Sequence, residues 1–273
     1  DRAIGLSVDH VVSRTVRDSA AMLDATGYAE PTSPYAYPAK AGPYLDEVSR
    51  SPGKLRIAWS SETPRGKPID PEVQAAIEQT AEMLSKLGHD VRNEGLGIDY
   101  RALYRAQGLV SAGNFAAGIK RWVEIKGHEP GDQIDGLAAR AYSAGKAISG
   151  MDSMWGWQQL RLINRQILAK FVDWDVYLTP VLCTNVPRVD WLDPGMSDLK
   201  EFDRRQADTF GYTPPFNMTG QPSLSLPLWQ SNSGLPIAMM FTAKYADEAT
   251  LYRLAGQLEK ELPWKDRKPV VWN

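Results

Sequence analysis

Serine and lysine residues spaced as Ser-x-x-Lys are the first pattern in this sequence that could do chemistry. On one helix this spacing places a lysine base beside a serine nucleophile. The pattern occurs at Ser51/Lys54, Ser143/Lys146 and Ser197/Lys200. Ser51-Pro-Gly-Lys54 cannot be helical across Pro-Gly, and the Lys-Thr-Gly and Ser-Asp-Asn segments of penicillin-recognising sites do not occur in the sequence. We therefore reject a Ser-Lys site of that kind.

Other nucleophiles lack the partners that would activate them. No Gly-x-Ser-x-Gly pentapeptide places a serine on a strained turn, and His10 beside Asp9 fits a loop before a helix better than a catalytic triad. Cys183 would need a basic neighbour to lower its pKa, and the nearest in sequence is Arg188. We therefore predict no catalytic residue in this chain.

Composition excludes several classes of partner. Thirty-one basic and thirty-three acidic residues leave a net charge of −2, which disfavours nucleic acid. One cysteine and three widely separated histidines exclude a disulfide framework and a thiolate zinc site, and no phosphate-cradling glycine motif occurs, so no metal or cofactor is expected. No apolar run approaches the roughly 20 residues of a membrane span. We expect a protein of the reducing cytoplasm that does not bind membranes.

The elements that must position any site alternate between strand and helix. Strand 55–59, a helix from Asp70-Pro71 to about residue 87 and strand 89–94 predict a βαβ unit with parallel strands. A short helix is predicted over 15–26, capped by Thr15, and a proline-rich loop over 28–52. This order is typical of an α/β protein.

The second half of the chain adds helices and a hairpin. Helices are predicted over 100–126, 134–148 and 153–174, followed by a strand at 175–180, a loop to about residue 200, strands at 223–229 and 235–241, and a helix over 247–261. We predict an α/β fold whose mixed sheet has flanking helices, with a helix-rich middle insertion at about 100–174. Only about five strands are found, so the sheet is expected to be incomplete and to end in an unpaired strand.

Three segments carry a resemblance to a known family. They are Asn217-Met-Thr-Gly-Gln-Pro-Ser-Leu-Ser-Leu-Pro-Leu228 with Gly234-Leu-Pro-Ile237, the stretch from Gly5 to Asp24, and Asp175-Val-Tyr-Leu-Thr-Pro180. Together they resemble the C-terminal portion of the amidase signature family of serine hydrolases. The stretch from Ser7 to Asp24 is similar to the branch that includes 6-aminohexanoate cyclic-dimer hydrolase. Ala238 departs from the family, which usually has glycine there.

The resemblance implies a function that this chain would share with a segment upstream of Asp1. Family members cleave linear, non-peptide amides with a lysine, a serine in a cis peptide and a nucleophilic serine, and none of these is expected in the present chain. The implied partners are a small-molecule amide substrate, the N-terminal half of the same enzyme and, if the protein forms a homodimer, a second copy. The alternative is a non-catalytic binding or assembly module that pairs with a separate chain. A Lys-Ser-Ser segment upstream in the gene would discriminate between the two.

Substrate contacts are expected where loops leave the carboxyl ends of strands. The loop after Thr179-Pro180 brings Cys183 and Thr184 forward, and the segment 213–217 forms a rigid, mostly apolar wall. A polar stripe on the helix over 100–126 is a second candidate, although a solvated face is its commoner explanation. The predicted substrate-binding residues are Cys183, Thr184, Phe216, Asn217, Gln107, Ser111 and Asn114.

We predict that this chain alone does not hydrolyse amides, because it lacks a nucleophile and base pair. The measurement is release of aniline from an aryl amide, compared with a buffer blank. Turnover that disappears when one serine of this chain is replaced would contradict the prediction.

Overall fold

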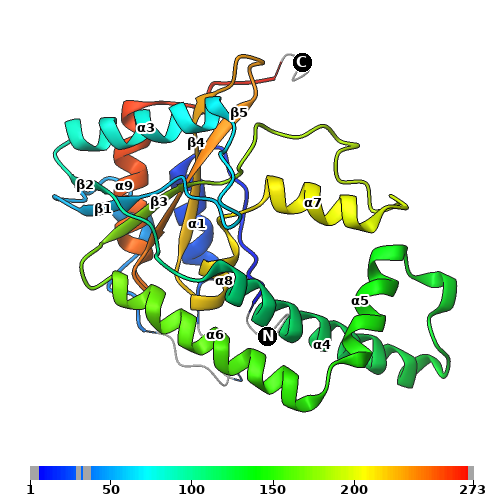
Figure 1. Ribbon diagram of the computed structural model, residues 1–273. Helices are drawn as coiled ribbons and strands as arrows, with labels where there is room; N and C mark the ends of the chain where they lie inside the picture. Colours follow the sequence, from blue (N-terminus) through cyan, green and yellow to red (C-terminus); the bar gives the residue numbers. More distant parts are fainter. Residues whose placement is uncertain (1–5, 29–31, 33–37, 270–273) are drawn as a thin grey trace.

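Five strands of the described chain form one mixed sheet, in the order β2-β1-β3-β5-β4 (Figure 1). The computed structural model describes residues 6–28, 32 and 38–269. The strands are β1 (Arg56–Trp59), β2 (Asp90–Asn93), β3 (Val176–Pro180), β4 (Ser223–Gln230) and β5 (Pro236–Ala243). β1 runs parallel to β2 and β3, whereas β5 runs antiparallel to β3 and β4. The predicted α/β class with a mixed sheet is confirmed.

One face of the sheet is covered by α3 (Pro71–Lys86) and α9 (Glu248–Glu261). Asp70 caps α3 by accepting a hydrogen bond from the Glu72 N–H at 2.8 Å, and Pro71 occupies the first turn. His89 joins the layers, since its Nδ1 accepts the Leu55 N–H at 3.1 Å while Nε2 lies 3.0 Å from Gln257 Oε1. The predicted βαβ unit is confirmed, because α3 connects β1 to β2 and these two strands pair in parallel. Two further helices, α1 (Val16–Thr26) and α2 (Tyr44–Glu47), pack beside α9.

The other face meets three helices that the middle and late parts of the chain supply. They are α4 (Tyr100–Lys126), α6 (Gly150–Lys170) and α8 (Pro214–Thr219), with α5 (Gly136–Ala147) and the 3₁₀ turn Gly131–Gln133 farther from the sheet. Tyr177 of β3 is buried on this face between Trp174, stacked at 5.2 Å, and the Phe216 ring at 6.0 Å. In Figure 1 α4, α5 and α6 extend away from the sheet as an arm, whereas α8 lies beside the sheet.

Close packing rather than amphipathic patterning holds the arm together. Both α5 and α6 contact α4, with Gly145 of α5 against Ala112 and Gly156 of α6 against Ala106. At Gly145 an added Cβ would collide with the carbonyl oxygen of Ala112. Only glycine lets α5 approach α4 so closely.

Two helices lie where the sequence analysis predicted no helix or strand. α7 (Leu199–Thr209) follows the expected loop after β3, and the expected wall 213–217 is α8, in which Pro214 and Pro215 take the first turn. α7 was missed because its buried face is small, with Thr209 its one fully buried residue. Part of the predicted loop 28–52 lies outside the described residues, and α2 forms within the remainder.

Two further expectations concern the edge strands of the sheet and the absence of a membrane span. β2 and β4 are the outermost strands, and no other strand of the described residues pairs with their free sides. Within the same residues, every helix is too short or too polar to cross a bilayer.

Asp175 anchors the beginning of β3 to both neighbouring strands. Its carboxylate accepts hydrogen bonds from the Arg56 N–H at 2.9 Å, from Arg56 Nη2 at 2.8 Å and from Lys244 Nζ at 2.8 Å. The hydrogen bonds from Arg56, and then those from Lys244, hold the pKa of Asp175 well below its usual range.

We expect Asp175→Asn to lower the free energy of unfolding by about 1–3 kcal/mol near neutral pH, because charge-assisted hydrogen bonds are lost. The Asp175 pKa is lower in the folded state, so its stabilisation is present above the unfolded pKa of about 4 and is lost as the pH falls below it. Urea unfolding from pH 7 to pH 3 measures both effects. Glu82→Gln, in the exposed pair with Lys86, is the control, and an equal loss in the two variants would contradict the prediction.

Candidate functional site

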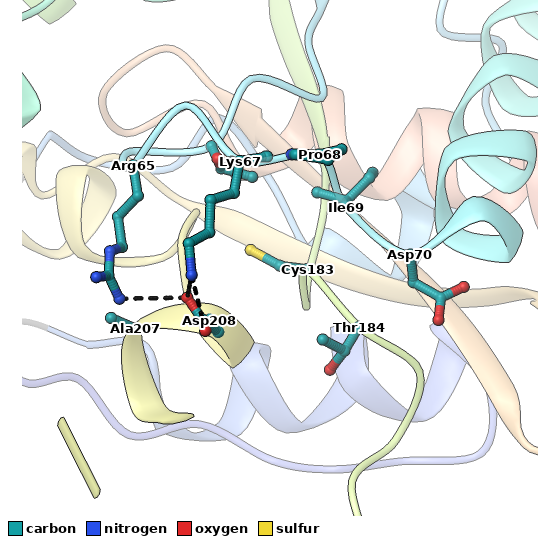
Figure 2. Close-up of a pocket in the computed structure, with 10 residues that line it drawn as sticks. Arg65, Lys67, Pro68, Ile69, Asp70, Cys183, Thr184, Ala207 and Asp208 are labelled. Carbon is teal, nitrogen blue, oxygen red and sulfur yellow. Dashed lines mark hydrogen bonds and ion pairs between the residues drawn. The ribbon is translucent and has the colours of Figure 1, made fainter. Parts of the chain in front are cut away.

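Two cavities lie beyond the carboxyl ends of the parallel strands. The first, of about 320 Å³, lies between the loops that follow β1 and β3 (Figure 2). The second, of about 520 Å³, lies between the loops that follow β1 and β2 and includes Glu62, Lys67 and Tyr100. Ligands of open α/β sheets bind at this end of the strands. These cavities are therefore the candidate site.

The backbone of Cys183 ties together the three segments around the first cavity. Its carbonyl oxygen accepts the Asp70 N–H at 2.9 Å, and its N–H donates to the Thr209 carbonyl at 2.9 Å. At Gly211 a Cβ would lie 2.9 Å from Cys183 Sγ and 3.0 Å from Pro64 Cδ, so a larger residue there would force one of these side chains to shift. The cavity walls are thus fixed by backbone contacts.

Buried phenols surround the Cys183 thiol behind the cavity. The Tyr212 hydroxyl donates to the Ser61 carbonyl at 2.9 Å and is also hydrogen-bonded with the thiol. The Tyr104 hydroxyl lies 3.4 Å from the Gly211 carbonyl oxygen. Burial raises the pKa of Cys183 to about 11 and that of Tyr104 to about 12, and it raises the pKa of Tyr212 as well. At neutral pH this layer is uncharged, and Cys183 is not a thiolate nucleophile.

The charged groups of the first cavity gather at its rim. Asp208 of α7 accepts from Lys67 Nζ at 2.9 Å and from Arg65 Nη1 at 3.2 Å, and Figure 2 shows both side chains reaching toward this carboxylate. The hydrogen bond from Lys67 lowers the pKa of Asp208. No group of three His, Cys, Asp or Glu side chains suited to a metal ion occurs in the described part of the chain.

The predicted residues fall into three groups. Cys183 and Thr184 line the first cavity, with Thr184 Oγ1 donating to the Asn185 carbonyl at 2.9 Å. Phe216 is buried against Tyr177 and lines neither cavity, while Asn217 is exposed on α8. The difference arises because segment 213–217 is helical and turns the two side chains in different directions.

The polar stripe of α4 begins at the candidate site. Gln107 and Asn114 are half-buried and Ser111 is exposed. Their spacing continues the helix row that starts with Tyr100, which lines the second cavity, and Tyr104, which lies near Gly211. This row leads from the cavities along the arm.

Sequence reasoning missed the residues of the cavity rim. Arg65 and Lys67 follow β1 just as Cys183 follows β3, and parallel pairing of these strands would have placed both loops at one end. Asp208 gave no such signal, because only the fold brings α7 across to the loop after β1.

The fold and the cavities define an α/β protein with a candidate ligand site at its strand ends, and comparison with known proteins identifies its family. The chain belongs to the amidase family, whose profile, "Amidase", matches residues 1–252. It is 28% identical to 6-aminohexanoate-cyclic-dimer hydrolase of Paenarthrobacter ureafaciens, covering 100% of this chain and 57% of the relative. It is 31% identical to putative amidase AmiB2 of Mycobacterium bovis, covering 98% and 54%.

Solved structures agree with this assignment. A 6-aminohexanoate cyclic dimer hydrolase complexed with substrate superposes with a TM-score of 0.84 and 29% identity over 96% of this chain and 56% of that one. A bacterial aryl acylamidase of the amidase signature family shares the fold, with a TM-score of 0.76 at 18% identity over 94% and 55%. The resemblance inferred from the sequence is confirmed. The chain spans a little over half the length of these relatives.

We expect the Cys183 thiol to react about a hundredfold more slowly with iodoacetamide at pH 8 in the folded protein than in urea, because its pKa is raised to about 11. Cys183 is the sole cysteine of the sequence, so mass spectrometry of the intact chain follows this one site. The urea-unfolded chain is the control, and equal labelling rates in the two states would contradict a buried neutral thiol.

Proposed function

We propose that this chain is the C-terminal portion of an enzyme that hydrolyses linear, non-peptide amide bonds, and that it supplies walls of the substrate site. The family match over residues 1–252 is the observation that carries the proposal. The relatives named as 6-aminohexanoate-cyclic-dimer hydrolases favour a small amide as the substrate. The lysine and two serines of the family's chemistry would come from the rest of the protein.

The candidate site suits a supporting role in that chemistry. In the proposed reaction the lysine takes the proton of the nucleophilic serine through the cis serine, and that serine attacks the amide carbon. The C–N bond then breaks and the amine leaves with the proton, and water hydrolyses the acyl-enzyme ester to release the carboxylic acid. Uncharged side chains in the wall near the reacting amide would not compete with the serine for the amide carbon. Cys183, a neutral thiol at neutral pH, and the Thr184 hydroxyl line such a wall.

The remaining predicted residues keep distinct places in the proposal. Gln107, Ser111 and Asn114 would line a path along α4 toward the cavities, and Asn217 would contact substrate from the exposed side of α8. Phe216 would support the wall through Tyr177, against which it packs.

We expect the full-length protein to hydrolyse an aryl amide or the 6-aminohexanoate cyclic dimer, and Thr184→Gln to raise its KM about tenfold with kcat within about twofold. The longer side chain would fill part of the cavity without touching the reacting groups. Initial rates over a substrate series measure both constants. Thr26→Gln, on the exposed last turn of α1, is the matched control.

A full-length protein that hydrolyses neither amide, yet is folded, would contradict the proposed function. An unchanged KM in Thr184→Gln, with activity retained, would instead move the substrate site away from this cavity.

A further inference from the structure

Arg65 and Lys67 present more positive charge at the cavity rim than the nearby carboxylates neutralise. Both cations share Asp208 with Arg204, whose Nη1 lies 2.9 Å from Asp208 Oδ2. The other acid of this network, Glu201, accepts from Arg204 at 2.6 Å and from Arg205 at 2.8 Å. Four cations therefore share two carboxylates within this network, which makes the rim a place for a further anion.

Besides Asp208, the acidic residue that lines the cavity is Asp70, and it does not neutralise the excess positive charge of the rim. Asp70 is committed to the N-terminus of α3, where its carboxylate accepts the Glu72 N–H at 2.8 Å and faces the positive end of the helix dipole. In Figure 2 Asp70 lies on the opposite side of the cavity from Arg65. Within the lining of the first cavity, the positive excess is therefore local to Arg65 and Lys67.

Both rim cations have donors to spare. The Arg65 and Lys67 side chains are 44% and 53% exposed. Among the described residues, Arg65 uses only Nη1 of its guanidinium in a hydrogen bond. A guanidinium has five N–H donors and an ammonium has three, so an incoming carboxylate can be bound without displacing Asp208.

Between the charged rim and Asp70, part of the cavity lining is apolar and uncharged. Pro68, Ile69 and the neutral Cys183 thiol contribute to its lining. A ligand that fits has a carboxylate at one end and a short hydrocarbon chain behind it, because the carboxylate would meet the rim and the chain would cover the apolar lining.

We propose that the cavity between β1 and β3 binds the carboxylate of a small organic acid at Arg65 and Lys67. The inference deepens the proposed function and rests on it for the origin of the ligand. Amide hydrolysis produces a carboxylate, and an amide substrate can also carry one at its far end. Both sources present the same group to the rim.

Binding of hexanoate to the full-length protein, measured by calorimetry, tests the site without any hydrolysis. Hexan-2-one is the neutral probe of similar shape, and we expect hexanoate to bind at least tenfold more tightly. Lys67→Met should weaken hexanoate binding at least tenfold, whereas Lys86→Met, in the exposed pair on α3, should stay within twofold. Asp208→Asn should tighten binding, because it removes a carboxylate that competes for the same cations.

Three results would overturn the proposal. They are equal affinity for hexanoate and hexan-2-one, equal losses in Lys67→Met and Lys86→Met, and weaker hexanoate binding in a folded Asp208→Asn. Inorganic sulfate that binds as tightly as hexanoate would also overturn it, since it would show an adventitious ion site only.

Kinetics of the full-length protein then distinguish the two sources. A higher kcat/KM for adipic acid monoanilide than for hexananilide, lost in Lys67→Met, assigns the carboxylate to the substrate. Competitive inhibition by hexanoate that Lys67→Met abolishes, without that preference, assigns it to the product. An active enzyme that shows neither of these two effects would overturn the inference. Hexanoate binding in a protein that hydrolyses no anilide would leave the inference standing and contradict the proposed function.

Discussion

The parallel pairing of β1 with β3 is the constraint on which the site depends. Ile57, Ala58 and Trp59 pair with Val176, Tyr177 and Leu178, so the two strands run in the same direction and their carboxyl ends lie at one edge of the sheet, where β3 continues to Pro180. The loops that follow must then leave the sheet side by side, although they are more than one hundred residues apart in the chain. Cys183 fixes this arrangement through its backbone bonds to Asp70 and Thr209.

Burial divides the groups around the cavity into a neutral layer and a charged rim. The Cys183 thiol and the tyrosine hydroxyls lie behind the loops, where desolvation keeps them protonated. Arg65, Lys67 and Asp208 lie at the mouth, where water and ion pairing support their charges. One cavity thus offers an uncharged wall and a cationic end, which is a suitable arrangement for orienting an amphipathic ligand.

The family assignment gives these features a context. The relatives are named as amidases and 6-aminohexanoate-cyclic-dimer hydrolases, and this chain matches a little over half of their length. A cavity at the strand ends, the polar row on α4 and the free sides of β2 and β4 are the surfaces that this portion presents. In the proposal, the catalytic lysine and serines act against such a surface.

The sequence by itself determined the local structure and the family. The capping residues Thr15, Asp70 and Asp247 mark helix starts that the structure confirms, because these hydrogen bonds form within one turn of helix. The βαβ unit and the final hairpin follow equally from local patterns of apolar residues. The amidase motifs were readable for a similar reason, since they are contiguous stretches of sequence.

Only the tertiary structure decided the composition of the site. Phe216 belongs to the core because two prolines begin a helix there, and the rim forms because α7 brings Asp208 to Lys67 across 141 positions of sequence. The sequence does not show which loop such contacts will reach, since α7 is polar, buries little of its surface and is held beside the cavity by ion pairs. Contacts of this kind depend on where the sheet ends place the loops, and that placement is a property of the whole fold.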